Sequence, residues 1–285
     1  MLETLVNPKK MERKPWEMFF IGLIYASLSV ILVYWIFANN SVLRQYTGLL
    51  IVTFTVMFTF PFMYYLIRLE AEEDSEIENS FTMLKANSRA IFALMWLFVG
   101  FVVAFSIWYV VLPSANLFQA QVQTYCQINS PGSIDSCVQR YAFKQDITGN
   151  TINGDFTRFL TILENNVFVM IFTLILSLIF GAGAIFILAW NATVISTAAG
   201  MLSNYNLSNL PMGLLRYFFH GLPEISSYFI AAVAGGIIGV GVIKYRFKGR
   251  KFWLLVQNAI ILIFAALVIL VIAGLMEVYI TPRLF

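Results

Sequence analysis

The chain has 285 residues, of which 60% are hydrophobic, 16% aromatic and 12% charged. A soluble globular domain carries about 25% charged residues, so this composition excludes a disordered protein and argues against a soluble enzyme. The net charge of +3 is too small for a nucleic-acid-binding surface. One histidine and two cysteines exclude sites that need two histidines or four thiolates from one chain. The sequence therefore predicts an all-α, polytopic helical membrane protein.

Apolar stretches of membrane-spanning length predict about six spans. A helix that crosses a bilayer needs about 20 mainly apolar residues. The first stretch carries bulky aromatic residues and lacks a small-residue cleavage site, so we expect it to stay as an anchor. In chain order, the expected spans are 17–37, 48–67, 90–112, 167–190, 225–243 and 254–276.

Polar segments between these spans divide the chain into three regions. Residues 1–112 form an expected three-span region that contains a charged connector at 68–89. Residues 113–165 form an extramembrane loop domain, and residues 166–285 form a C-terminal membrane region. The acidic start of the connector lacks the glycine spacing of a calcium loop, so we interpret it as a solvated face rather than a metal site.

Lys and Arg residues near the ends of the spans predict the orientation. Four of them lie in residues 1–16 and three in the 68–89 connector, which places both segments in the cytoplasm and the 113–165 loop outside. Cys126 and Cys137 lie in this loop, where an oxidising environment favours a disulfide over the alternative of two free thiols. We expect a multi-pass protein of the cell membrane with a cytoplasmic N-terminus.

One basic segment conflicts with six single crossings. Residues 244–251 (KYRFKGRK) hold five Lys or Arg residues, and crossings of the two preceding spans would place them outside. A broken or re-entrant element within 167–203, turning near Gly181 and Gly183 or at Asn191, would remove the conflict. We therefore expect such an element in the C-terminal half.

The apolar second half of the chain contains a series of ionisable residues. Arg216, His220 and Glu224 follow one another at intervals of four, which places them on one face of a helix. Gly221 and Pro223 interrupt this face and predict a kink or break. Ionisable groups in a membrane segment are costly unless paired or hydrated, so this face is a candidate functional site. A structural hydrogen bond across the kink, or an Arg216 side chain that reaches the interface, is the alternative.

Four more polar residues lie at the ends of the expected C-terminal spans. Asn165 and Asn166 precede one span, Asn191 follows it, and Glu277 closes the last span. We group them with the preceding face as a polar site that binds a partner or stabilises the fold. Ordinary interfacial residues are the alternative.

No catalytic motif accompanies these polar residues. The sequence has no two-histidine metalloprotease helix, no Gly-x-Ser-x-Gly elbow and no phosphate-binding loop. We therefore expect no enzyme activity, no metal and no cofactor.

Glycines recur in two of the expected spans. Spaced glycines let helix backbones approach closely within lipid, so they predict tight packing, with self-association as one use of it. The glycines concerned are Gly181, Gly183, Gly235, Gly236, Gly239 and Gly241.

These polar residues and glycines make the C-terminal half resemble the stage II sporulation protein M family. The resemblance covers about residues 164–285, and the first half is similar to the longer archaeal members. Where the family usually has a proline before the histidine, this chain has Phe219. The elements are Asn165-Asn166, Gly181, Gly183, Asn191, His220-Gly221-Leu-Pro-Glu224 and Glu277-Val-Tyr-Ile-Thr281-Pro282.

The resemblance implies an integral membrane protein without known catalysis. In spore-forming bacteria, relatives recruit peptidoglycan-degrading partners to the septal membrane. An archaeal-type member would keep a membrane-organising or partner-binding role.

These observations favour a multi-pass membrane scaffold that self-associates or recruits other membrane or cell-envelope proteins. Its expected partners are membrane lipid and proteins, not nucleic acid. A small transporter or channel with a site at the broken helix around His220 and Glu224 is the alternative.

Overall fold

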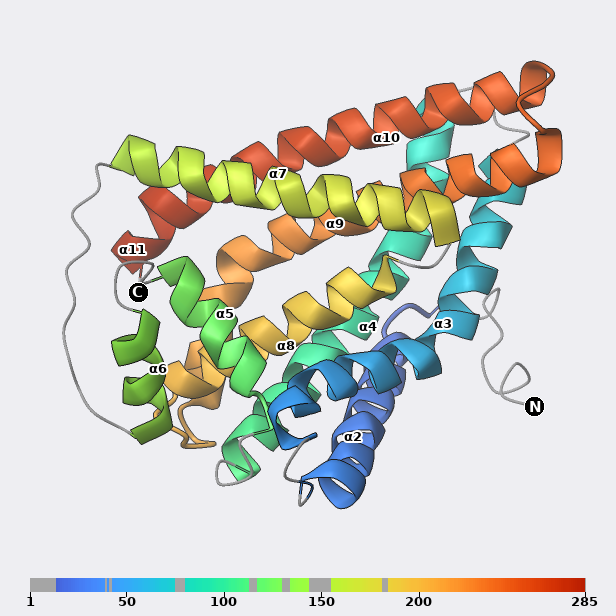
Figure 1. The fold of residues 1–285 in the computed structure, drawn as a ribbon. Helices are drawn as coiled ribbons and strands as arrows, with labels where there is room; N and C mark the ends of the chain where they lie inside the picture. Colours follow the sequence, from blue (N-terminus) through green and yellow to red (C-terminus); the bar gives the residue numbers. More distant parts are fainter. Residues whose placement is uncertain are drawn as a thin grey trace.

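The computed structural model describes residues 14–284 except for 39, 41–42, 75–79, 113–116, 130–133, 144–154 and 181–183. The described residues form helices, with no strand among them (Figure 1). The main helices are α2 (Glu17–Phe37), α3 (Thr47–Asp74), α4 (Ser80–Val111), α5 (Gln119–Asn129), α6 (Ile134–Phe143), α7 (Asp155–Phe180), α8 (Ile185–Leu202), α9 (Leu210–Tyr245) and α10 (Arg250–Leu275). Short elements are η2 (Arg44–Tyr46), η4 (Met276–Ile280) and α11 (Thr281–Leu284).

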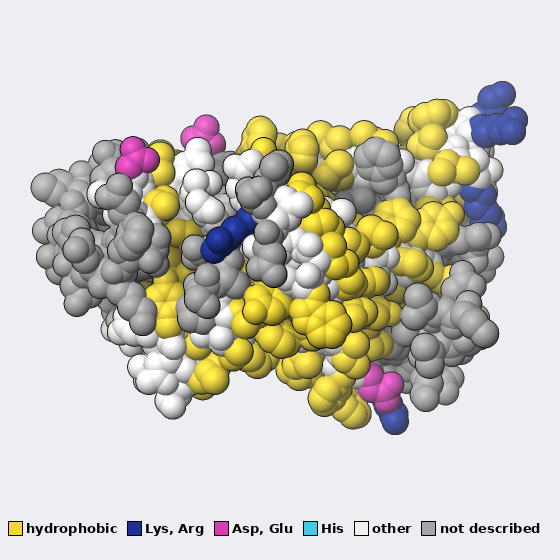
Figure 2. Space-filling model, turned by 60° about the horizontal axis from the view of Figure 1, so that its bottom comes forward, with side chains coloured by type: hydrophobic (Ala, Val, Ile, Leu, Met, Phe, Trp, Pro, Cys, Tyr) yellow, Lys and Arg dark blue, Asp and Glu magenta, His cyan; other side chains and the backbone are white. Residues whose placement is uncertain are grey.

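Seven helices of the described chain are long and apolar enough to cross a membrane, namely α2, α3, α4, α7, α8, α9 and α10 with its C-terminal extension. Hydrophobic side chains cover the middle of the face in Figure 2, as expected for a surface that contacts lipid. The all-α, polytopic fold is therefore confirmed, with seven candidate spans instead of about six.

The additional span comes from the stretch expected to hold a re-entrant element. This stretch contains two helices, because α7 ends at Phe180 and α8 begins at Ile185. Gly181 and Gly183 lie between them and outside the described residues, whereas Asn191 lies within α8. Glycine is a common helix terminator, which fits a boundary at this point. The predicted re-entrant turn is thus replaced by two complete helices.

Helices α7 and α9 run parallel. Helix α8, which connects them in the chain, must therefore run back across the bundle in the opposite direction. Close approaches join Gly235 to Leu174 and Gly239 to Leu178, so the residue numbers rise together along both helices. The Ser177 hydroxyl also donates a hydrogen bond to the carbonyl of Ala232 at 2.5 Å. Two parallel helices joined by a third have their starts at the same end of the bundle.

Seven crossings remove the charge conflict of the basic segment 244–251. The turn between α9 and α10 lies at the same end of the bundle as the end of α3, whereas α5, α6 and the C-terminus lie at the opposite end (Figure 1). The charged stretch 68–89, expected as a connector, falls largely within the end of α3 and the start of α4, and it shares one side of the candidate membrane region with the basic segment.

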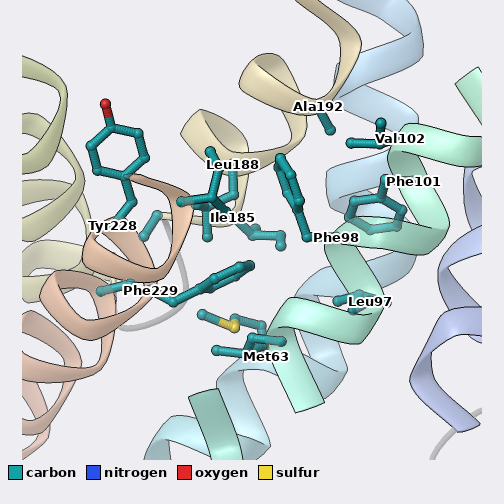
Figure 3. Close-up of a cluster of buried hydrophobic side chains, with 14 of the residues drawn as sticks. Met63, Leu97, Phe98, Phe101, Val102, Ile185, Leu188, Ala192, Tyr228 and Phe229 are labelled. Atoms are coloured by element: carbon teal, nitrogen blue, oxygen red, sulfur yellow. The ribbon is translucent and has the colours of Figure 1, made fainter. Parts of the chain in front are cut away.

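Helices from both membrane regions pack into one core. The rings of Phe98 on α4 and Phe229 on α9 meet edge to face with centroids 6.0 Å apart. Met63 of α3 and Leu188 of α8 are fully buried beside them (Figure 3). An edge-to-face aromatic pair adds about 0.5–1.5 kcal/mol beyond the area it buries.

The glycines of α9 allow close packing within one chain. A Cβ atom added at Gly239 would lie 2.5 Å from the Leu178 carbonyl oxygen of α7, and one at Gly241 would lie 2.9 Å from Leu255 Cδ1 of α10. A similar crossing, which the sequence patterns did not indicate, joins Gly22 of α2 to Gly100 of α4. The close approach predicted for the α9 glycines is therefore used inside the molecule.

Gly239→Ala should destabilise the protein by about 1–3 kcal/mol, because the new methyl group meets the α7 backbone. The matched control is Gly221→Ala in the same helix, where an added Cβ meets nothing within 4 Å. The control should be neutral or stabilising by up to about 1 kcal/mol, since alanine is the better helix former. Thermal unfolding in detergent measures both, and equal midpoints would contradict the packing described.

Cysteine labelling in intact cells tests the seven-span topology. The exposed residues Ser208, between α8 and α9, and Lys248, between α9 and α10, lie on opposite sides of the predicted membrane. We expect a membrane-impermeant maleimide to label Ser208→Cys directly and Lys248→Cys only after permeabilisation. With the N-terminus in the cytoplasm, as the charge distribution predicts, the reverse pattern would mean that α8 does not cross. The native cysteines are paired with each other and leave no background label.

Candidate functional site

The centre of the candidate site is a hydrogen bond between Glu224 and Tyr228, one turn apart on α9. The Tyr228 hydroxyl donates to Glu224 Oε1 at 2.9 Å, and Tyr228 is fully buried. The next residues along the helix satisfy backbone carbonyls: Ser226 Oγ donates to Leu222 O and Ser227 Oγ to Glu224 O, both at 2.6 Å. The half-buried Glu224 carboxyl therefore has a defined partner on its own helix.

Two further helical segments bring polar side chains to Glu224. The buried Asn166 of α7 hydrogen bonds to the Glu224 carboxyl, and Glu277 of η4 is close enough to interact electrostatically with both Glu224 and Tyr228. Asn165 Nδ2 donates to Asn166 Oδ1 at 3.3 Å and so orients the Asn166 amide. We call Asn166, Glu224, Tyr228 and Glu277 the polar cluster.

Glu277 lies in a turn of π-helix. Segment η4 spans Met276–Ile280, and the Thr281 hydroxyl donates to the Met276 carbonyl oxygen at 3.1 Å where the α-helix resumes. Single π turns inside α-helices are rare and frequently accompany functional sites. The Glu-x-x-x-Thr-Pro element of the sequence is therefore the segment that changes the helix type.

The polar cluster can act in two ways. The hydrogen bond from Asn166 to Glu224 joins α7 to α9 inside an apolar environment, and Glu277 of η4 places a second carboxyl near this bond. Two carboxyls and a phenol can also hold and pass a proton, with the Asn166 amide as a hydrogen-bonding partner. Both uses are consistent with the same geometry.

The structure brings only some of the predicted residues together. Asn166, Glu224 and Glu277 meet in the polar cluster. Arg216 lies earlier on α9 with an exposed side chain. The Asn191 amide donates to the Ile187 carbonyl of its own helix at 2.8 Å.

Helix α9 is not broken within the predicted motif. It continues from Leu210 to Tyr245 with Gly221 and Pro223 inside it. Membrane helices tolerate proline because neighbouring helices and serine hydroxyls satisfy the freed backbone groups. The side chain of His220 lies outside the described residues, so its predicted role remains a prediction.

Tyr228 is the member of the cluster that the sequence patterns did not identify. It extends the interval of four that runs through Arg216, His220 and Glu224. Tyrosine was not considered in that series because it is uncharged at neutral pH and common in membrane helices. The interval itself was the signal that could have found it.

A second candidate region lies at the end of the bundle that carries α5 and α6. Cys126 of α5 and Cys137 of α6 form a disulfide with their Cα atoms 5.7 Å apart, which confirms the predicted pair. Five residues of these helices line a surface hollow of about 480 Å³: Gln123, Gln127, Ile134, Asp135 and Val138.

Helix α5 is fixed to the membrane helices by a buried glutamine. Gln121 Nε2 donates to the Gly48 carbonyl of α3 at 3.1 Å and to Thr193 Oγ1 of α8 at 3.2 Å. The Thr47 hydroxyl donates to the Leu117 carbonyl at 3.0 Å, just before α5 begins. Buried polar side chains with such partners fix the relative position of the elements they join.

Seven candidate membrane helices, a polar cluster among the C-terminal ones and a disulfide-linked helical pair at one end define a polytopic helical membrane protein. A model of the Stage II sporulation protein M family matches residues 88–282 of this chain. The chain therefore belongs to this family. Every member of the polar cluster and both cysteines lie within the matched residues.

The chain is also similar to an uncharacterized protein of Methanocaldococcus jannaschii. The two are 32% identical over 131 residues, which cover 44% of this chain and 72% of the relative. This similarity agrees with the resemblance to archaeal-type members. No solved structure matches the chain.

Tyr228→Phe should lower the free energy of unfolding by about 1–3 kcal/mol, because it removes the hydrogen bond to a carboxyl in an apolar environment. The control is Tyr65→Phe on α3, where half of the tyrosine side chain is exposed, and it should change stability little. Thermal unfolding in detergent measures both. Combining Tyr228→Phe with Glu224→Gln should cost less than the sum of the single changes, and strict additivity would contradict direct coupling.

Proposed function

We propose that the protein is a non-enzymatic membrane scaffold that recruits a membrane or cell-envelope protein through α5 and α6. The observation that carries the proposal is the attachment of this helical pair to the bundle through Gln121. A disulfide and a buried hydrogen-bonded side chain hold the pair in one position. A preorganised surface binds a partner without the entropic cost of ordering itself.

The surface of the pair has the composition of a recognition site. Gln123, Gln127 and Asp135 supply hydrogen-bonding groups beside the hollow, and Ile134 and Val138 supply apolar contact. Interfaces between proteins combine such groups, with an apolar centre and a polar rim. Membership of the Stage II sporulation protein M family supports a role at a membrane assembly.

Photo-crosslinking in intact cells tests this proposal. A photoreactive phenylalanine analogue placed at the exposed residue Gln123 should give a protein adduct of discrete mass. The same probe at Phe264, which is 68% exposed on α10 and faces the expected lipid, should give none. Removing both cysteines should lower the yield of the Gln123 adduct, because the disulfide no longer holds α5 and α6 together.

Adducts of two differently tagged copies would identify the partner as a second copy of this chain, and adducts of a different mass would identify another protein. Either result supports a scaffold. Lipid adducts alone at Gln123 would contradict it.

Transport is the second candidate function, and the polar cluster is the observation that favours it. A carboxyl pair inside membrane helices is a common element of proton and cation pathways. Glu224→Gln separates the two functions: a transporter should stay folded and lose flux in liposomes. A scaffold should lose stability or assembly instead.

A further inference from the structure

The turn between α9 and α10 concentrates positive charge on the surface. Five of its eight residues are basic and none is acidic, and all five basic side chains are exposed. We call residues 244–251 the basic turn; its charged members are Lys244, Arg246, Lys248, Arg250 and Lys251. Lys and Arg side chains gather at this end of the molecule in Figure 2.

Backbone hydrogen bonds give the basic turn a fixed shape. The Arg246 N–H donates to the Val242 carbonyl and the Lys248 N–H donates to the Tyr245 carbonyl, each at 2.9 Å. Arg246 and Phe247 adopt left-handed conformations with φ of 49° and 61°, and Gly249 follows with φ of 88°. The cations are therefore held together by the backbone, and their proximity does not depend on chance contacts of long side chains.

The basic turn lies where two candidate spans meet the membrane surface. One span ends at Tyr245 and the next begins at Arg250. Large apolar side chains flank the cations: Ile243 is 80% exposed, and Phe247 and Trp253 are each 65% exposed. Aromatic side chains at this depth favour the headgroup region of a bilayer.

We propose that the basic turn is a binding site for the headgroups of anionic phospholipids. Lys and Arg ammonium and guanidinium groups would bind the lipid phosphates, while Phe247 and Trp253 would pack beside them at the level of the headgroups. A membrane fits better than a soluble partner because the exposed apolar residues Ile243 and Trp253 lie on the two candidate spans that the turn joins. This inference does not depend on the scaffold proposal.

Native mass spectrometry of the detergent-solubilised protein tests the site with phosphatidylglycerol and phosphatidylcholine as probes. The test variant combines Lys244→Gln, Arg246→Gln and Lys248→Gln. The control combines Arg44→Gln, Arg216→Gln and Arg283→Gln, which removes the same charge from exposed positions outside the basic turn. We expect the test variant to bind phosphatidylglycerol at least about tenfold more weakly and the control to bind it like the original protein.

Equal weakening in both variants would show a general charge effect and overturn the proposal, as would no weakening in either. Inorganic phosphate should not displace phosphatidylglycerol; efficient displacement would mean that the turn binds free phosphate, and would also overturn it.

A second measurement leaves all five basic residues of the turn unchanged. Brominated phosphatidylglycerol should quench tryptophan fluorescence of the original protein more strongly than brominated phosphatidylcholine. The excess should disappear in Trp253→Phe. An excess that persists in this variant would place the lipid elsewhere and overturn the proposal.

Discussion

The fold of the C-terminal half depends on how closely α7 and α9 approach. Glycines at 235 and 239 let the α9 backbone lie directly against the carbonyls of Leu174 and Leu178. The same parallel alignment, three turns earlier on α9, brings Asn166 to the Glu224 carboxyl. A larger residue at either glycine would separate the helices and leave the carboxyl without its α7 partner. Packing and polar pairing are therefore parts of one constraint.

The sequence predicted the elements of this half better than their arrangement. Glu224, Asn166 and Glu277 could be chosen because ionisable and amide groups are rare in membrane helices. The expected span 167–190 combined α7 with only the start of α8, because the hydroxyl residues of α8 lower its mean hydropathy. The structure explains those residues: Ser196 and Thr197 hydroxyls bond to carbonyls of their own helix. Gln121 could not be predicted, since a glutamine in a polar loop is buried only by tertiary contacts.

The two ends of the bundle have different characters. One end carries the disulfide-linked pair α5 and α6, fixed by the buried Gln121 amide and by the hydrogen bond from Thr47 to the Leu117 carbonyl. The other carries the basic turn, whose charge is exposed beside large apolar side chains. The polar cluster lies among the helices that connect them, within the segments matched to the family. A change in the α7–α9 contact would therefore affect helices that extend to both ends.

The parallel course of α7 and α9 also determines the order in which the chain can assemble in a membrane. Neighbouring antiparallel helices can enter a bilayer together as a hairpin, but α9 reaches α7 only after α8 has crossed in the opposite direction. Glu277 arrives later still, with the last helical segment. Until then Glu224 lies in the bilayer with an incomplete set of neighbours. Because Asn166 and Glu277 lie near the two ends of the C-terminal half, the polar cluster is complete only when that whole half is in place.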